Sequence, residues 1–248
     1  MVSVHSKAAE LGNPSFVWRF GQDRRLALIR RYAALEDRRI LDIGCGIGTY
    51  VKKFREFSPH VTGIDIDFER VREGARSAPN LLMAVSEHLP YRDAVFDVLL
   101  LNEVIEHVRD DRETLREAVR VTRPGGHIFI YAPNRLYPFE THGIFLGKRY
   151  VFGNIPLANY LPGPLRRRLI PHARAYLKRD IRRLVRGLDV TVVEHTFVYP
   201  GFDNIIRRSR LLGTVLRRVL YRAEQTPLRN FGLSHFVVLR RNGAPEVR

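Results

Sequence analysis

The chain has 248 residues, of which 45% are hydrophobic and 27% are charged, a composition typical of a soluble globular protein. Its single cysteine, Cys45, excludes an intrachain disulfide and a multi-cysteine zinc site, so we expect a reducing, cytoplasmic environment. No apolar run approaches the ~18 residues of a membrane-spanning helix, and we expect no signal peptide in residues 1–12.

The net charge of +16 is unevenly distributed along the chain. Residues 1–134 carry 20 Lys and Arg against 19 Asp and Glu, whereas residues 135–248 carry 22 against 7. A positive field of this kind attracts nucleic acid, anionic lipid or acidic substrates. A water-exposed, arginine-rich surface without a partner would give the same totals, so the charge alone leaves both interpretations open.

The first half of the chain alternates expected strands with expected helices. Apolar spacing predicts helices over 23–35, 49–57, 67–78 and 112–121. Short apolar runs predict strands over 38–43, 60–66, 81–85, 96–101 and 127–132. Strands that alternate with helices at this interval indicate βαβ units and a parallel sheet.

The regular pattern ends at Pro133. Residues 133–175 contain six prolines and many aromatic residues without a clear period, as expected of either a long functional loop or a small cap over the sheet. A helix is expected over 178–186, and strands are expected over 190–199 and 235–239. Between these strands, residues 204–223 have the pattern of one amphipathic helix with arginines opposite its apolar face.

A glycine-rich loop follows the first buried strand, where residues 40–48 read I-L-D-I-G-C-G-I-G. Glycine at positions 44, 46 and 48 permits a positive φ angle and lets the backbone approach a ligand closely. We expect Thr49 to cap the next helix, whose free N–H groups would face the same crevice. The spacing differs from a dinucleotide fingerprint, which requires a glycine at position 49. A purely structural turn is the alternative.

The second strand ends in an acidic residue. Asp65 follows Gly44 by 21 residues and lies at the expected carboxyl end of the strand over 60–66. A carboxylate at this point of a doubly wound sheet can accept hydrogen bonds from both hydroxyls of a ribose. Asp67 is expected to cap the following helix instead.

Several segments of the first half of the chain resemble class I S-adenosylmethionine-dependent methyltransferases. The glycine spacing, with Asp42 two residues before Gly44, resembles motif I. Residues 86–91 and 96–98 are similar to the adenine-side segment and fourth strand, and residues 123–126 to the turn before the fifth. Residues 38–134 together resemble the type 11 branch, which includes ubiquinone and menaquinone biosynthesis methyltransferases. Where that family often has an aspartate this chain has Val85, so adenine contacts would come from Ser86, Glu87 or backbone groups.

The resemblance implies an α/β, Rossmann-like, doubly wound fold: a seven-stranded mixed sheet with its last strand antiparallel and a cap inserted after the fifth strand. We expect four parts: an N-terminal helical segment over the cofactor site (1–37), a cofactor-binding core (38–134), a basic, aromatic substrate cap (135–186), and C-terminal strands with a basic amphipathic helix that completes the sheet (187–248). The implied cofactor is S-adenosylmethionine. The residues expected to bind it are Asp42, Gly44, Cys45, Gly46, Gly48, Asp65, Ile66, Ser86, Glu87 and Asn102.

Candidate catalytic residues follow the fourth strand. On a helical turn, Glu103, Glu106 and His107 would share one face, and two carboxylates with an imidazole suit a divalent metal. The pattern E-x-x-E-H is similar to a magnesium-binding motif of quinone-biosynthesis O-methyltransferases and small-RNA 2′-O-methyltransferases. The same letters also occur in type 11 enzymes not thought to use metal. Three roles stay open: a Mg²⁺ site completed by His142, a general base at His107, or a structural role.

We expect methyl transfer to an oxygen of a small-molecule or lipid-linked acceptor, since aligning donor and acceptor supplies much of the acceleration. Aromatic residues of the cap would wall the acceptor pocket or form a small core: Tyr137, Phe139, Phe145, Tyr150, Phe152 and Tyr160. The 204–223 helix would lie on an anionic membrane, engage RNA, or pack on the sheet with its arginines in water. The alternative functions are an RNA (tRNA or rRNA) methyltransferase and a non-enzymatic cofactor-binding scaffold.

Overall fold

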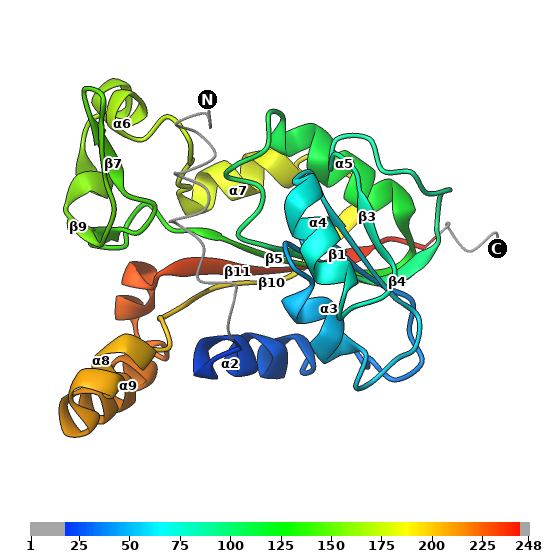
Figure 1. The fold of residues 1–248 in the computed structure, drawn as a ribbon, viewed down its shortest axis with the longest axis horizontal. Coiled ribbons are helices and arrows are strands. Elements are labelled where there is room, and N and C mark those ends of the chain that lie inside the picture. The colour runs from blue at the N-terminus through cyan, green and yellow to red at the C-terminus, as the bar shows by residue number, and fades with distance from the viewer. Residues whose placement is uncertain (1–17, 244–248) are drawn as a thin grey trace.

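A seven-stranded sheet forms the centre of the computed structural model, which describes residues 18–243 (Figure 1). The spatial order is β3-β2-β1-β4-β5-β11-β10. Only β11 runs antiparallel to its neighbours β5 and β10, which confirms the predicted fold class. The strands are β1 Ile40–Ile43, β2 Val61–Asp65, β3 Leu81–Met83, β4 Phe96–Asn102, β5 Thr122–Pro133, β10 Val190–Val198 and β11 Ser234–Arg241.

Helices cover both faces of the sheet and bury its apolar side chains. On one face, α2 (Phe20–Ile29) and α3 (Thr49–Phe54) share a buried cluster with residues of β1, β4 and β5. On the other face, α5 (Asp111–Val121) and α7 (Lys178–Val185) form a second cluster with the same strands. Helix α4 (Phe68–Ala75) connects β2 to β3. Burial on both faces explains the continuous apolar runs of β1 and β4.

The register of the central strands brings the predicted motifs to one edge of the sheet. Ile43, at the end of β1, pairs with Ile64 of β2 and with Leu101 of β4. The next residues along the chain are therefore Gly44, Asp65 and Asn102, at the carboxyl ends of three adjacent strands. Ligands of open α/β sheets bind outside these ends.

Residues 134–175 form a small cap with its own interior. Two small two-stranded sheets pair β6 (Phe139–Glu140) with β9 (Ile155–Pro156) and β7 (Ile144–Leu146) with β8 (Arg149–Val151). They are followed by η2 (Ala158–Tyr160) and α6 (Gly163–Leu169). Ala158, Ile170 and Ala173 make an apolar cluster. Beside it lies a buried ion pair between Arg166 and Glu140, 2.7 Å long. Of the two interpretations of this segment, the structure shows the cap.

The predicted single helix over 204–223 is wrong, because the segment forms two helices, α8 (Asp203–Arg208) and α9 (Arg210–Ala223). Ser209 between them is extended, with φ −148°, and its hydroxyl accepts a hydrogen bond from the Leu212 amide. A Cβ at Gly213 would clash with Ile206, so the absence of a side chain there lets α8 fold back on α9. We call residues 203–223 the α8–α9 hairpin.

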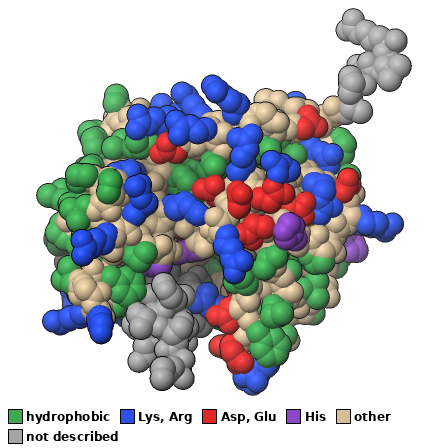
Figure 2. Space-filling model, turned by 90° about the horizontal axis from the view of Figure 1, so that it is seen from above, with side chains coloured by type: hydrophobic (Ala, Val, Ile, Leu, Met, Phe, Trp, Pro, Cys, Tyr) green, Lys and Arg blue, Asp and Glu red, His purple; other side chains and the backbone are tan. Residues whose placement is uncertain are grey.

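Of the three interpretations of this segment, packing of the apolar face on the sheet does not describe α9. Leu211 is 78% exposed and Leu212 is 61% exposed. The hairpin projects away from the sheet, below the cap in the view of Figure 1. On the face of the molecule seen in Figure 2, Lys and Arg side chains are dispersed widely, whereas Asp and Glu side chains gather mainly in one region.

Candidate active site

The glycine loop after β1 has a left-handed backbone at each of its glycines. The φ angles are 72° at Gly44, 55° at Gly46 and 77° at Gly48. Gly48, rather than Thr49, occupies the N-cap of α3, and Thr49 is the first helical residue, which corrects the predicted cap. A Cβ at Gly44 would clash with Val104, whereas one at Gly46 would meet no atom within 4 Å. The backbone of the loop therefore borders open space at Gly46.

Asp65 ties the glycine loop to the end of β2. Its side chain is buried, Oδ2 accepts a hydrogen bond from the Gly46 amide at 2.8 Å, and Oδ1 accepts one from the Asp67 amide at 2.9 Å. Asp67 caps α4 by accepting hydrogen bonds from the amides of Glu69 and Arg70, as predicted. The Asp65 carboxylate is thus fixed at the cleft with further lone pairs available to a ligand.

Asp42 places a second carboxyl group beside Asp65. Its side chain is almost fully buried, and burial raises its pKa well above the ordinary value, with the nearby charge of Asp65 adding to the effect. A positively charged group bound in the cleft would favour the ionised form of both carboxyls. The local charge therefore suits a cationic ligand.

One cavity of about 1820 Å³ joins the glycine loop to the cap and the α8–α9 hairpin. Of the residues predicted to bind cofactor, Gly48 is outside its lining. The predicted residues that line it are Asp42, Gly44, Cys45, Gly46, Asp65, Ile66, Ser86, Glu87 and Asn102. From the cap, Tyr137, Phe139 and Phe152 contribute aromatic walls. Phe145, Tyr150 and Tyr160 are not part of the lining.

Residues 86–91, the segment expected to lie beside the adenine, are held mainly by hydrogen bonds within the protein. The Ser86 hydroxyl lies 3.1 Å from the Thr114 hydroxyl, and a Glu87 oxygen accepts a hydrogen bond from the Arg109 amide at 2.9 Å. Apolar surface is exposed nearby, since Ile66 is 69% exposed and Val85 is 39% exposed, and both line the cavity. Two exposed aliphatic side chains at a cleft suit the faces of a flat ring.

Glu103 belongs to a network that the sequence did not predict. The segment after β4 is a turn rather than an α-helix, and Glu103 has a left-handed backbone with φ 57°. Its carboxylate accepts hydrogen bonds from Arg25 at 2.7 Å and from the Ser234 hydroxyl at 2.6 Å. Arg25 also donates to the Asn102 side chain and lies over the Tyr131 ring. Arg25 and Ser234 therefore occupy the Glu103 carboxylate, and its negative charge helps to raise the pKa of the neighbouring Glu106.

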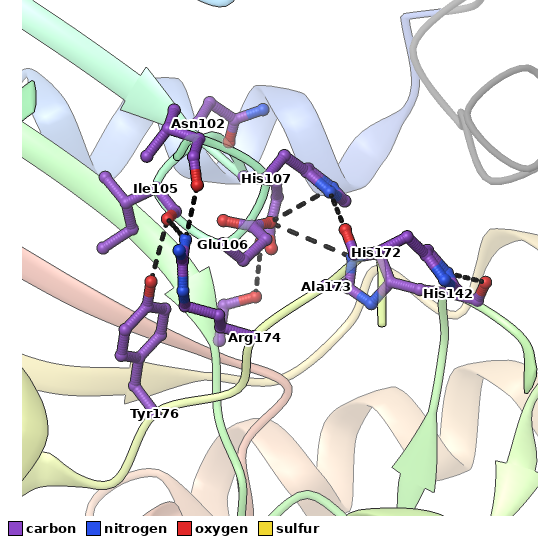
Figure 3. A network of polar contacts seen from close by, with 12 residues as sticks. Asn102, Ile105, Glu106, His107, His142, His172, Ala173, Arg174 and Tyr176 are labelled. Carbon is purple, nitrogen blue, oxygen red and sulfur yellow. Dashed lines mark hydrogen bonds and ion pairs between the residues drawn. The ribbon is translucent and has the colours of Figure 1, made fainter. Parts of the chain in front are cut away.

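Glu106, His107 and His142 come together beside the turn that follows β4 (Figure 3). Glu106 is 2% exposed, and within the described residues neither of its carboxylate oxygens has a hydrogen-bond partner. Its Oε1 lies 3.9 Å from Nε2 of His107 and 3.9 Å from Nε2 of His142. Burial raises the pKa of Glu106 well above its usual range. These three potential ligand atoms lie within 4.8 Å of one another.

The other ring nitrogen of each histidine is already bonded. The His142 Nδ1–H donates to Glu140 at 2.8 Å, and the His107 Nδ1–H donates to the carbonyl oxygen of His172 at 2.9 Å. These bonds fix the tautomers and leave the Nε2 lone pairs free, near Glu106. Burial, with a smaller effect of His142, lowers the pKa of His107 to about 4, so its ring is neutral at physiological pH. The arrangement matches that of metal-ligating histidines, whose second nitrogen is held by a carboxylate or carbonyl.

The strand order, the glycine loop and the buried Asp65 define a Rossmann-like fold of the class I S-adenosylmethionine-dependent methyltransferase type. Residues 41–130 match the type 11 family model described as "Methyltransferase domain". The match supports the predicted type 11 branch of class I S-adenosylmethionine-dependent methyltransferases for these residues.

Curated relatives include both N- and O-methyltransferases. The chain is 37% identical over 125 residues to norajmaline N-methyltransferase of Rauvolfia serpentina, a match that covers 46% of this chain and 43% of the relative. It is 30% identical over 139 residues to a ubiquinone biosynthesis O-methyltransferase of Aromatoleum aromaticum, covering 53% and 59% respectively. The chain thus spans about half the length of these relatives.

Solved structures share the fold at low sequence identity. A methyltransferase from Haloferax volcanii in complex with the Trm112 activator has a TM-score of 0.63 at 16% identity, covering 96% of this chain and 95% of that one. An S-adenosylmethionine-dependent methyltransferase from Mesorhizobium loti has a TM-score of 0.61 at 18% identity, covering 87% and 96%. Both alignments span most of this chain.

Proposed function

We propose that this chain transfers a methyl group from S-adenosylmethionine to an oxygen atom of a small-molecule or lipid-linked acceptor. The observation that carries the proposal is one cavity lined by the glycine loop, Asp65 and the two histidines His107 and His142. Cofactor-binding and candidate catalytic groups therefore border the same space. The named relatives act on oxygen and nitrogen, and the oxygen-directed ones support our choice of acceptor atom.

The residues present fit the cofactor. S-adenosylmethionine supplies an electrophilic methyl group on a positively charged sulfur. Asp65 would accept hydrogen bonds from the ribose hydroxyls, and the backbone at Gly46 leaves room for close approach. Asp42 would stabilise positive charge on the bound molecule. Ile66 and Val85 would pack on the adenine ring. The hydrogen bond of the aspartate that the chain lacks at position 85 would come from Ser86, Glu87 or backbone groups.

The three-residue group of Glu106, His107 and His142 would act on the acceptor. One carboxylate and two imidazoles fit Mn²⁺ or Zn²⁺ better than Mg²⁺, which prefers oxygen ligands. A divalent ion there would polarise the acceptor hydroxyl as a Lewis acid. Without an ion, the neutral Nε2 of His107 would take the hydroxyl proton as a general base. Both roles use Nε2 of His107, and we assign Glu103 to neither because Arg25 and Ser234 hold its carboxylate.

The acceptor can be found by an untargeted labelling experiment. Methyl-labelled S-adenosylmethionine is incubated with the protein and a native extract, which is then divided into lipid, RNA, protein and small-molecule fractions. We expect label in the small-molecule or lipid fraction, and much less label there with Asp65→Ala at the same cofactor concentration. Label in RNA would establish the alternative RNA methyltransferase. Cofactor binding without any labelled product would establish the scaffold function.

Metal use is tested on the same reaction once the labelled acceptor is isolated. We expect excess chelator to remove activity and Mn²⁺ to restore it in the wild type but not in His142→Gln. Full activity in excess chelator, together with loss of activity in His107→Gln, would replace the metal by a general base. Asn242→Ala, a substitution on the far side of the sheet, is the matched control and should behave as the wild type.

A further inference from the structure

We propose that the outer face of the α8–α9 hairpin docks on the surface of an anionic lipid bilayer. The four most exposed aliphatic residues of α9 are Leu211, Leu212, Val215 and Val219, at 78%, 61%, 52% and 56% exposure. Their spacing places them on one side of the helix. Such a group of exposed aliphatic side chains on one helix marks a contact surface rather than scattered single residues.

The charge around these aliphatic residues has one sign. Residues 203–223 contain six arginines and one acid, Asp203, which pairs with Arg217 at 3.1 Å. The other five arginines are exposed, and within the described residues none of them forms an ion pair. They are Arg207, Arg208, Arg210, Arg218 and Arg222. The hairpin therefore combines exposed aliphatic side chains with uncompensated positive charge.

An anionic bilayer matches both properties. Aliphatic side chains enter the boundary between headgroups and acyl chains, while arginines contact lipid phosphates with their long stems along the interface. RNA would use the arginines but leave the aliphatic side chains without a role, because bases stack on aromatic rings. A second copy of the chain would cover the aliphatic side chains but bring two arginine groups together across a two-fold axis. Charge and apolarity together therefore favour the bilayer.

The inner side of α9 faces the cavity, so the proposed docking surface lies close to the expected acceptor site. Leu216 and Leu220 line the cavity, together with Ile205 of α8. Helix α9 thus separates the docking face from the acceptor side of the cavity, and a lipid-linked acceptor would reach the cavity along an apolar path. This last step rests on the proposed function, whereas the docking itself does not. Among the described residues, no helix has the length and apolarity to cross a bilayer.

Co-sedimentation with vesicles tests the docking without cofactor or acceptor. The full chain is mixed with phosphatidylcholine vesicles that contain phosphatidylglycerol, or with phosphatidylcholine alone, across a salt series. We expect binding to the anionic vesicles that falls as salt rises. Arg218→Gln/Arg222→Gln should bind roughly thirtyfold more weakly, since each arginine near an anionic surface contributes about fivefold. The matched double substitution Arg72→Gln/Arg76→Gln, on exposed positions of α4 and its end, should bind as the wild type.

The aliphatic contribution is tested separately. Leu211→Gln/Val215→Gln should also weaken vesicle binding, whereas Leu82→Gln/Met83→Gln, on the exposed edge strand β3, should not. All four hairpin positions are exposed, so these variants should fold. Wild type that fails to bind anionic vesicles, or hairpin variants that bind like wild type, would overturn the proposal. If the wild type does not bind vesicles but binds RNA, and the hairpin variants lose RNA binding, the occupant is RNA. If instead the wild type self-associates and the hairpin variants do not, the occupant is a second copy of the chain.

Discussion

The core of β1 to β5 and the cap that follows it are stabilised in different ways. Strands β1 and β4 are buried almost entirely, between large apolar clusters on the two faces of the sheet. The cap has an apolar cluster of few residues and depends on polar contacts, with Arg166 reaching Glu140, Asn159 and the carbonyl oxygen of Ala173. The comparison shows that regular apolar packing positions the cofactor loop, while a buried ion pair positions His142 through Glu140.

The largest expected effect is in the cap. Arg166→Met should leave the buried Glu140 carboxylate without its cation and destabilise the cap by about 3 to 5 kcal/mol. Hydrogen exchange read by mass spectrometry should increase in residues 139–170 and stay unchanged in β1 and β4. Glu140→Gln/Arg166→Met, which removes both charges, should recover much of the protection. Equal loss of protection in core and cap would show that the two regions unfold as one.

A glycine substitution in the core should have the next largest effect. Gly44→Ala combines a left-handed backbone with a clash against Val104 and should lower the free energy of unfolding by about 3 kcal/mol. Gly125 has a similar φ, but a Cβ there would meet no atom within 4 Å, so Gly125→Ala should lower the free energy of unfolding by only about 1 kcal/mol. Denaturant unfolding measures both. Gly44→Ala/Val104→Ala should regain part of the loss, and the clash would be disproved if it did not.

His235 of β11, which bonds the chain just after the cap, should make the stability of the protein depend on pH. His235 donates from Nε2 to the Tyr176 carbonyl oxygen at 2.8 Å and accepts at Nδ1 from His195 at 3.0 Å. Burial lowers the pKa of His235 to about 4, so the native state binds fewer protons than the unfolded chain below the ordinary value of 6.5. Stability should therefore be complete above about pH 6.5 and fall by about 3 kcal/mol as the pH drops to about 4.

This pH effect is measured as a difference between two proteins. His235→Gln should unfold with a flatter dependence on pH over the same range, because other titrating groups contribute equally to both. Parallel curves for wild type and variant would contradict the assignment to His235.

The smallest expected effect compares two helix caps. Asp67→Ala removes hydrogen bonds to two amides of α4 and should cost about 1 kcal/mol. Ser209→Ala removes one long bond of 3.4 Å at the start of α9 and should cost less than about 0.5 kcal/mol. Thermal unfolding measures both. A larger cost at Ser209 would mean that the break between α8 and α9 depends on its hydroxyl rather than on the close contact at Gly213.

Local patterns predict the core well, and the structure brings most of the expected cofactor residues to the lining of one cavity. The order of strands, the position of Asp65 and the cap at Asp67 depend on periodicity and spacing, which lie within a short stretch of chain. The network around Glu103 could not be predicted from such local patterns, because its partners Arg25 and Ser234 are distant in sequence. Nothing in the sequence distinguishes Arg25 from the other arginines of its helix. The hairpin was mispredicted for a related reason: apolar periodicity shows that a helix is amphipathic, but not which surface covers its apolar face.

The most direct test of the account is calorimetric titration of the chain with S-adenosylmethionine. The central claim is that Asp65 and the glycine loop bind this cofactor. The account predicts saturable one-to-one binding that weakens roughly a hundredfold in Asp65→Ala, since two hydrogen bonds to a charged acceptor are lost. Asp93→Asn, an exposed carboxyl before β4, should bind as the wild type. Absence of binding, or equal affinity in Asp65→Ala, would contradict the claim.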